Sequence, residues 1–132
     1  MRRHASLTAI LAVLALAAFA FPAMVGAAAP KKGASYTGEL KETQSRGSKR
    51  VVLKVSSSGK TGRVRLECSG TRFGVSSKFS ISKGKFTAKK TTGSLLVWRL
   101  RGGFSSSQKA TAKLYLPAAC DGKGGKITLT LA

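Results

Sequence analysis

The chain has little from which an enzyme site could be built. It contains one histidine, His4, four acids (Glu39, Glu42, Glu67 and Asp121) and no asparagine. His4 lies in a segment expected to be cleaved, so the mature protein would lack Ser-His-Asp and Cys-His machinery and histidine-bound metals. Four scattered carboxylates are poor material for a glycosidase pair or a calcium cage. The sequence therefore predicts a protein that is not an enzyme and needs no metal or cofactor.

Acidic residues are also scarce in relation to basic ones. The 24 Lys and Arg residues give the chain a formal net charge of +20. Only Arg2 and Arg3 belong to the segment expected to be removed, so the mature domain keeps most of this charge. So much charge of one sign opposes compaction and attracts polyanions.

The N-terminus has the order of a secretory signal peptide. A positive head at Arg2 and Arg3 precedes a stretch without charged side chains from Ala5 to Ala29. Its apolar part, Leu7 to Phe21, is shorter than the roughly 20 residues that cross a bilayer, which argues against an uncleaved anchor. The residues after the Arg pair are not those of a twin-arginine signal, so the general secretory route is expected.

Small residues mark the end of this segment. Val25 to Ala29 permits cleavage after Ala27 or Ala28, and no cysteine is near enough for a lipid-modified N-terminus. The predicted division is a helical signal peptide at residues 1–28, a linker at 29–34 and one β domain at 35–132. The mature protein is expected to be secreted or extracytoplasmic, with cell-wall association open.

Cys68 and Cys120 are the two cysteines of the chain. An even count in an exported protein predicts a disulfide. The alternative, a pair of free or catalytic thiols, has neither CxxC spacing nor a nearby base. Closing a loop of roughly 50 residues would stabilise the domain by about 4 kcal/mol in the chain-entropy model.

Apolar and polar residues alternate in short runs after residue 34, which predicts β-strands. In Lys49 to Ser56 the apolar residues occupy every second position, and the same holds for Gly62 to Cys68 after a turn at residues 57–60. These two runs are expected to pair as an antiparallel hairpin. Further inward faces are predicted at Tyr36 and Leu40; Phe79 and Ile81; Phe86 and Ala88; Leu96, Trp98 and Leu100; Ala110, Ala112, Leu114 and Leu116; and Ile127, Leu129 and Leu131.

These runs predict an all-β fold of about eight strands in an antiparallel meander, closed into a small barrel or folded into a sandwich. The strand of Leu96 to Leu100 is expected to end ahead of Gly102 and Gly103. Trp98 is assigned to the core rather than to ligand stacking.

Basic residues occupy alternate positions along the predicted strands and should face outward. The candidate polyanion-binding residues are Arg63, Arg65, Lys83, Lys85, Lys89, Arg99 and Arg101. A sheet surface with this pattern can bind phosphates or sulfates in a salt-sensitive way. The alternative is a solvated face that only keeps the protein soluble.

Turn and core positions carry a resemblance. The motifs concerned are Gly-x-Ser-Tyr-Thr-Gly at 33–38, Val-x-Leu-x-Val-Ser from Val51, Lys-Gly-Lys-Phe at 83–86, Ala-Thr-Ala-x-Leu at 110–114 and a Cys-x-Gly motif that begins at each cysteine. With them the chain resembles small exported β-rich proteins of uncharacterised function from high-GC Gram-positive bacteria. The resemblance implies export, fold and disulfide, and it transfers no binding residue.

The function predicted from these features is that of a secreted, non-catalytic β domain that binds anionic polymers of the cell envelope through a basic sheet surface. Two alternatives stay open, a small barrel that carries an apolar ligand and a histidine-free hydrolase. Sequence-specific nucleic acid binding is not expected, because an exported protein leaves the compartment that holds the nucleic acids of the cell. The mature protein should have no membrane anchor and should be a monomer.

Overall fold

A computed structural model describes residues 28–40, 49–68, 71–120, 122 and 124–132. All its regular elements are strands, which confirms the all-β prediction. The strands are β1 (Ser35–Leu40), β2 (Lys49–Val55), β3 (Thr61–Cys68), β4 (Thr71–Val75), β5 (Phe79–Ser80), β6 (Lys85–Thr92), β7 (Leu95–Ser106), β8 (Lys109–Tyr115) and β9 (Gly125–Leu131). The expected signal peptide lies outside the described residues, and within them no helix could cross a membrane.

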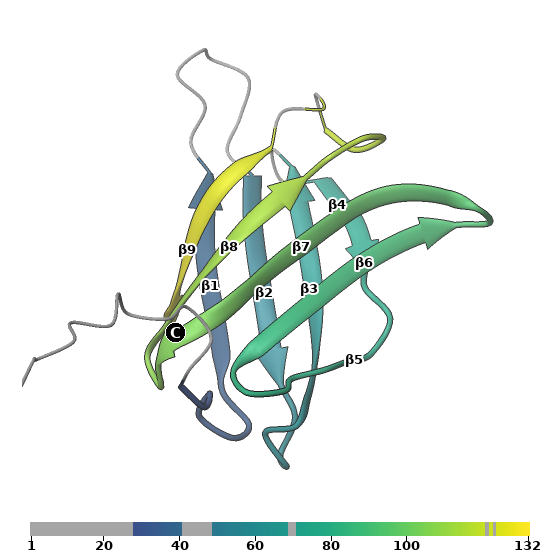
Figure 1. Cartoon of the computed structure of the whole chain (residues 1–132). Helices are drawn as coiled ribbons and strands as arrows, with labels where there is room; N and C mark the ends of the chain where they lie inside the picture. The colour runs from purple at the N-terminus through teal and green to yellow at the C-terminus, as the bar shows by residue number, and fades with distance from the viewer. Residues whose placement is uncertain (1–27, 41–48, 69–70, 121, 123) are drawn as a thin grey trace, which may run out of the picture.

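The strands form one antiparallel sheet that curls into a nearly closed barrel (Figure 1). Its order is β4-β3-β2-β1-β9-β8-β7-β6, so two meanders are joined where the first strand pairs with the last. The barrel has a seam between its end strands, β4 and β6. There the aliphatic part of Lys90 on β6 lies over Gly74 on β4, and β5 pairs with β3 farther along the seam.

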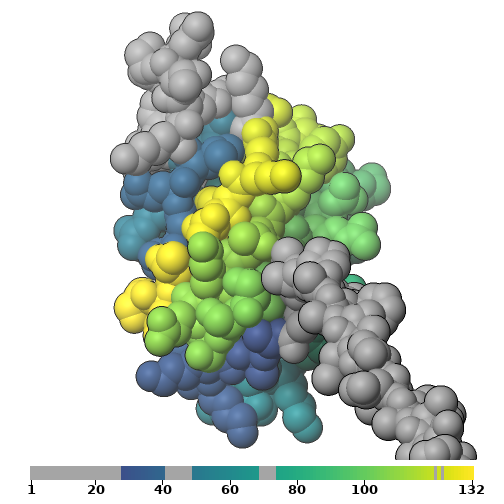
Figure 2. All heavy atoms as spheres, turned by 60° about the vertical axis from the view of Figure 1, so that its left-hand side comes forward, coloured from purple at the N-terminus to yellow at the C-terminus, as the bar shows by residue number. Residues whose placement is uncertain are grey.

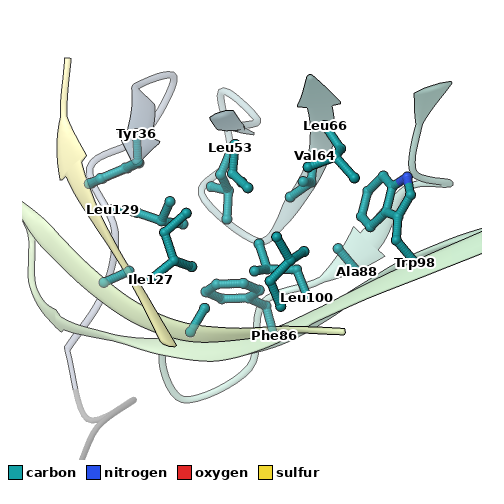
Figure 3. Close-up of a cluster of buried hydrophobic side chains, with 14 of the residues drawn as sticks. Tyr36, Leu53, Val64, Leu66, Phe86, Ala88, Trp98, Leu100, Ile127 and Leu129 are labelled. Atoms are coloured by element: carbon teal, nitrogen blue, oxygen red, sulfur yellow. The ribbon is translucent and has the colours of Figure 1, made fainter. Parts of the chain in front are cut away.

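The core lies between the two meanders. Figure 3 shows side chains of β1 to β3, such as Leu53 and Leu66, pointing toward those of β6, β7 and β9, such as Phe86, Leu100 and Leu129. These side chains come from the alternating positions that the sequence pattern predicted, because every second residue of a strand faces the same side of the sheet. Trp98 is fully buried, which confirms its assignment to the core.

A line of aromatic rings crosses one end of the barrel. Tyr36 contacts Phe104 edge-on at 4.9 Å between ring centroids, Phe104 is 5.6 Å from Phe86, and Phe86 is 5.7 Å from Phe79 on β5. The Tyr36 hydroxyl accepts a hydrogen bond from the backbone N–H of Lys31 at 2.8 Å and donates one to the Ser107 carbonyl. The rings thus connect β1, β7, β6 and β5.

Strand β7 does not end where the glycines were expected to break it. It continues through Gly102 and Gly103 to Ser106, so that part of the prediction is wrong. A Cβ at Gly102 would lie 2.2 Å from the carbonyl oxygen of Thr111 and 2.6 Å from the Cα and Cβ of Ala112. Glycine serves here to let β8 approach closely inside a continuous strand.

Strand β4 was not predicted. It pairs with the end of β3 through an irregular register, and Ser76 follows it. The buried Ser76 hydroxyl accepts a hydrogen bond from the Val64 N–H at 2.9 Å, and the Ser76 N–H donates to the Val64 carbonyl at 2.7 Å. A serine side chain therefore takes the place of a backbone carbonyl just beyond the end of β4.

The predicted disulfide is present. Cys68 at the end of β3 is joined to Cys120 in the connection from β8 to β9, with 5.8 Å between their Cα atoms. Strands β3 and β8 belong to different meanders, so the bond connects the two halves of the barrel.

Candidate polyanion-binding surface

The outer side of strands β6 to β9 carries a group of exposed cations, which we call the basic face: Lys85, Lys89, Arg99, Arg101, Lys113 and Lys126. Their outward orientation follows from strand geometry, because successive residues of a strand point to opposite faces of the sheet. Figure 2 shows part of the outer surface made by these strands, with the yellow of β9 beside the blue of β1.

The strand registers align these cations across the sheet. Arg101 on β7 lies directly opposite Lys113 on β8, and Lys113 lies opposite Lys126 on β9. In the neighbouring row Lys89 on β6 lies opposite Arg99 on β7. Like charges directly opposite on adjacent strands destabilise a sheet, so this arrangement lowers the stability of the folded protein.

Tyr115 ends the second row. It lies opposite Arg99, whose guanidinium carbon is 5.2 Å from the centre of the Tyr115 ring, within cation–π range. The Tyr115 side chain is 50% exposed, so the pair presents both a donor group and a flat ring to solvent. One exposed ring gives a single stacking position, whereas surfaces that stack bases use several aromatic side chains.

The described acids lie elsewhere. Glu39 on β1 and Glu67 on β3 are each directly opposite Arg50 on β2, on the other half of the barrel. Glu67 is also 3.1 Å from Arg65, measured from Oε1 to Nε. Among the residues that the structure describes, carboxylates are thus placed beside arginines of β2 and β3 and away from the basic face.

Only part of the predicted binding set comes together. Lys85, Lys89, Arg99 and Arg101 share the basic face. Lys83 is exposed in the turn before β6, with a positive φ of 52°.

Two other predicted residues belong to the opposite half. Arg63 and Arg65 lie on β3, and Figure 1 shows β6 and β7 crossing in front of β2 and β3. The outer sides of the two halves therefore point away from each other. Arg63 lies directly opposite Lys54, so this half of the barrel also has a cross-strand pair of like charges.

Sequence reasoning missed Lys113 and Lys126. Both could have been found from alternation, because Ala112 and Leu114 flank Lys113 as inward residues and Ile127 follows Lys126. The sequence pattern does not show the strand register, which places both residues in a row with Arg101.

The described residues contain no group of three or more His, Cys, Asp or Glu side chains that could hold a metal ion. No protein-family model matches the chain, and no curated protein matches it either. The resemblance to exported proteins of high-GC Gram-positive bacteria therefore stays a prediction.

Proposed function

We propose that this protein is a secreted, non-catalytic binding module for anionic polymers of the cell envelope, and that the basic face is its binding surface. The observation that carries the proposal is the row of Arg101, Lys113 and Lys126 across three strands. Three adjacent cations that repel one another cost stability, and an anionic chain lying across the strands would offset that cost. A face that only keeps the protein soluble does not need its charges aligned.

Salt dependence follows from the same arrangement. Each cation that neutralises an anion of the polymer releases counterions, so affinity falls steeply as salt rises. The expected ligand is a flexible polymer with regularly repeated anionic groups, such as a polyol phosphate of the wall. Export through the predicted signal peptide is part of the proposal, since it brings the domain to such polymers.

The test is retention of the secreted protein on immobilised polyglycerol phosphate across a salt series. A basic-face variant carries Gln at Arg101, Lys113 and Lys126. A matched control carries Gln at three exposed cations outside the face, Lys31, Lys32 and Arg50. Both lose the same formal charge.

The basic-face variant should elute at much lower salt than the wild type, with the salt slope reduced by about one for each contact removed. The control should elute close to the wild type. Equal shifts in both variants would mean that net charge alone causes retention, and the proposal would be wrong.

A further inference from the structure

Two surface hollows lie at the end of the barrel where β5 crosses the seam. The first, of about 310 Å³, is lined by three cations, two hydroxyl residues and two apolar residues: Lys54, Arg63, Lys78, Ser56, Thr61, Val55 and Gly62. Its cations come from β2, β3 and the segment before β5. Lys54 and Arg63 lie directly opposite each other, so two of its cations are cross-strand neighbours.

The second hollow, of about 360 Å³, has a similar lining. It contains two cations, three hydroxyl residues and two apolar residues: Lys85, Arg101, Ser80, Ser82, Thr87, Phe86 and Gly102. No carboxylate is among the lining residues of either hollow. Arg101 also belongs to the row on the basic face, so this hollow continues that row.

The two hollows lie close together, on either side of strand β5. Lys78 lines the first and Ser80 lines the second. Residues two apart in a chain are at most about 7 Å apart between Cα atoms. Between them Phe79 points the other way, because its ring packs against Gly62 and Phe86. Lys78 and Ser80 therefore share the outer side of β5.

We infer that the two hollows are successive anion subsites of one track that begins on the basic face and passes over β5 to Lys54 and Arg63. This inference rests on the proposed function and extends it in two ways. It includes Arg63, which the basic face leaves out, and it specifies the ligand as a polymer of tetrahedral oxyanions.

The lining residues favour this ligand class. An arginine fork binds carboxylates and phosphates alike, so the hydroxyl donors beside it make the distinction. A phosphodiester has two non-bridging and two ester oxygens in a tetrahedron and a sulfate ester has three non-bridging oxygens, whereas a carboxylate has two oxygens in one plane and uses fewer of these donors. Phosphate and sulfate polymers share the chemistry, so the experiment separates them.

The test compares Arg63→Gln and Arg101→Gln with the control Arg50→Gln, each of which removes one exposed arginine. Affinity is measured for polyglycerol phosphate oligomers of increasing length, for heparin and for polyglutamate. The wild type should bind long phosphate oligomers much more tightly than short ones. Arg63→Gln and Arg101→Gln should each weaken binding of the long oligomers about tenfold, and Arg50→Gln should change it less than about twofold.

Protection of lysines from acetylation gives a second readout on the unaltered protein. Long polyglycerol phosphate should protect Lys54, Lys78 and Lys85 and leave Lys31 and Lys32 reactive. Heparin that binds as well as polyglycerol phosphate would assign the track to tetrahedral oxyanions of both kinds.

The outcomes separate the two proposals. If Arg101→Gln weakens binding while Arg63→Gln binds like the wild type and Lys54 stays reactive, the basic face functions but the track over β5 is refuted. If polyglutamate binds as tightly as the phosphate polymer, the ligand class is wrong. If no polymer binds better to this protein than to an unrelated one of equal charge, the proposed function itself fails.

Discussion

At the scale of single residues, Lys113 has the least favourable surroundings on the basic face. It has Arg101 opposite on one side and Lys126 opposite on the other. A cation in this position lowers stability, and the anionic polymer proposed above would offset that cost. Stability and binding should therefore respond in opposite directions when this charge is reversed.

Lys113→Glu should raise the free energy of unfolding by on the order of 1 kcal/mol, because two repulsive cross-strand pairs become attractive. The same change should make the protein elute from polyglycerol phosphate at lower salt. Urea unfolding and the salt series measure the two effects, and Lys113→Gln should give intermediate values for both. Unchanged retention of the Glu variant would exclude Lys113 from the binding surface.

The absence of a side chain at Gly102 allows β7 and β8 to lie close together. Gly102→Ala would place a methyl group 2.2 Å from the Thr111 carbonyl oxygen, and backbone atoms of β7 or β8 would have to shift. We expect a loss of about 1 to 3 kcal/mol, measured by urea unfolding. Gly93→Asn is the control, because nothing lies within 4 Å of that position and Asn tolerates its positive φ. Similar stability of Gly102→Ala and the wild type would show that the strands can separate at no cost.

At the scale of elements, β5 depends on one side chain. Its two residues pair with β3, and the Phe79 ring packs on Gly62 and beside Phe86. Because the strand is so short, the ring contact contributes much of what keeps this segment on the seam. The segment carries Lys78 on one side of the ring and Ser80 on the other.

Phe79→Ala should therefore destabilise the protein by about 1 to 3 kcal/mol and release β5. The amide of Ile81, which donates to the Lys60 carbonyl at 2.7 Å, should exchange with solvent faster than in the wild type. Phe79→Leu keeps an apolar contact and should show a smaller change in both. Normal protection of Ile81 in the Ala variant would mean that backbone pairing alone holds β5.

The sequence was most informative where one face of a strand is buried. The β2–β3 hairpin, the inward positions of β8 and the burial of Trp98 all follow from alternation and turn residues. Strand β4 could not be predicted, because its pairing with β3 shifts register between Arg65 and Glu67, and the sequence pattern does not show such a shift. The continuation of β7 through Gly102 depends on the closeness of β8, which is a tertiary property.

The candidate site was predictable only in part for the same reason. Alternation shows which cations face outward, as for Arg99 and Arg101. It does not show which strands become neighbours, so the alignment of Arg101 with Lys113 and that of Arg63 with Lys54 required the register.

At the scale of the whole molecule, the Cys68–Cys120 disulfide joins the two meanders at a separation of 52 residues along the chain. A loop of this length predicts a stabilisation of about 4 kcal/mol through the unfolded state. Replacing both cysteines by serine should lower the urea midpoint accordingly, and reduction of the wild type should give a similar midpoint. If reductant leaves the wild-type midpoint unchanged, the bond contributes nothing to stability.

The pairing of β1 with β9 also determines when this domain can fold. Strand β1 lies between β2 and β9, and β9 consists of seven residues that end one position before the end of the described chain. A ribosome or an export channel therefore releases β2 and β3 long before the last neighbour of β1 emerges. Such long-range pairing is slow to form. In the proposed export, the chain would therefore cross the channel with its barrel still open, because β1 gains its last neighbour only when β9 has been delivered.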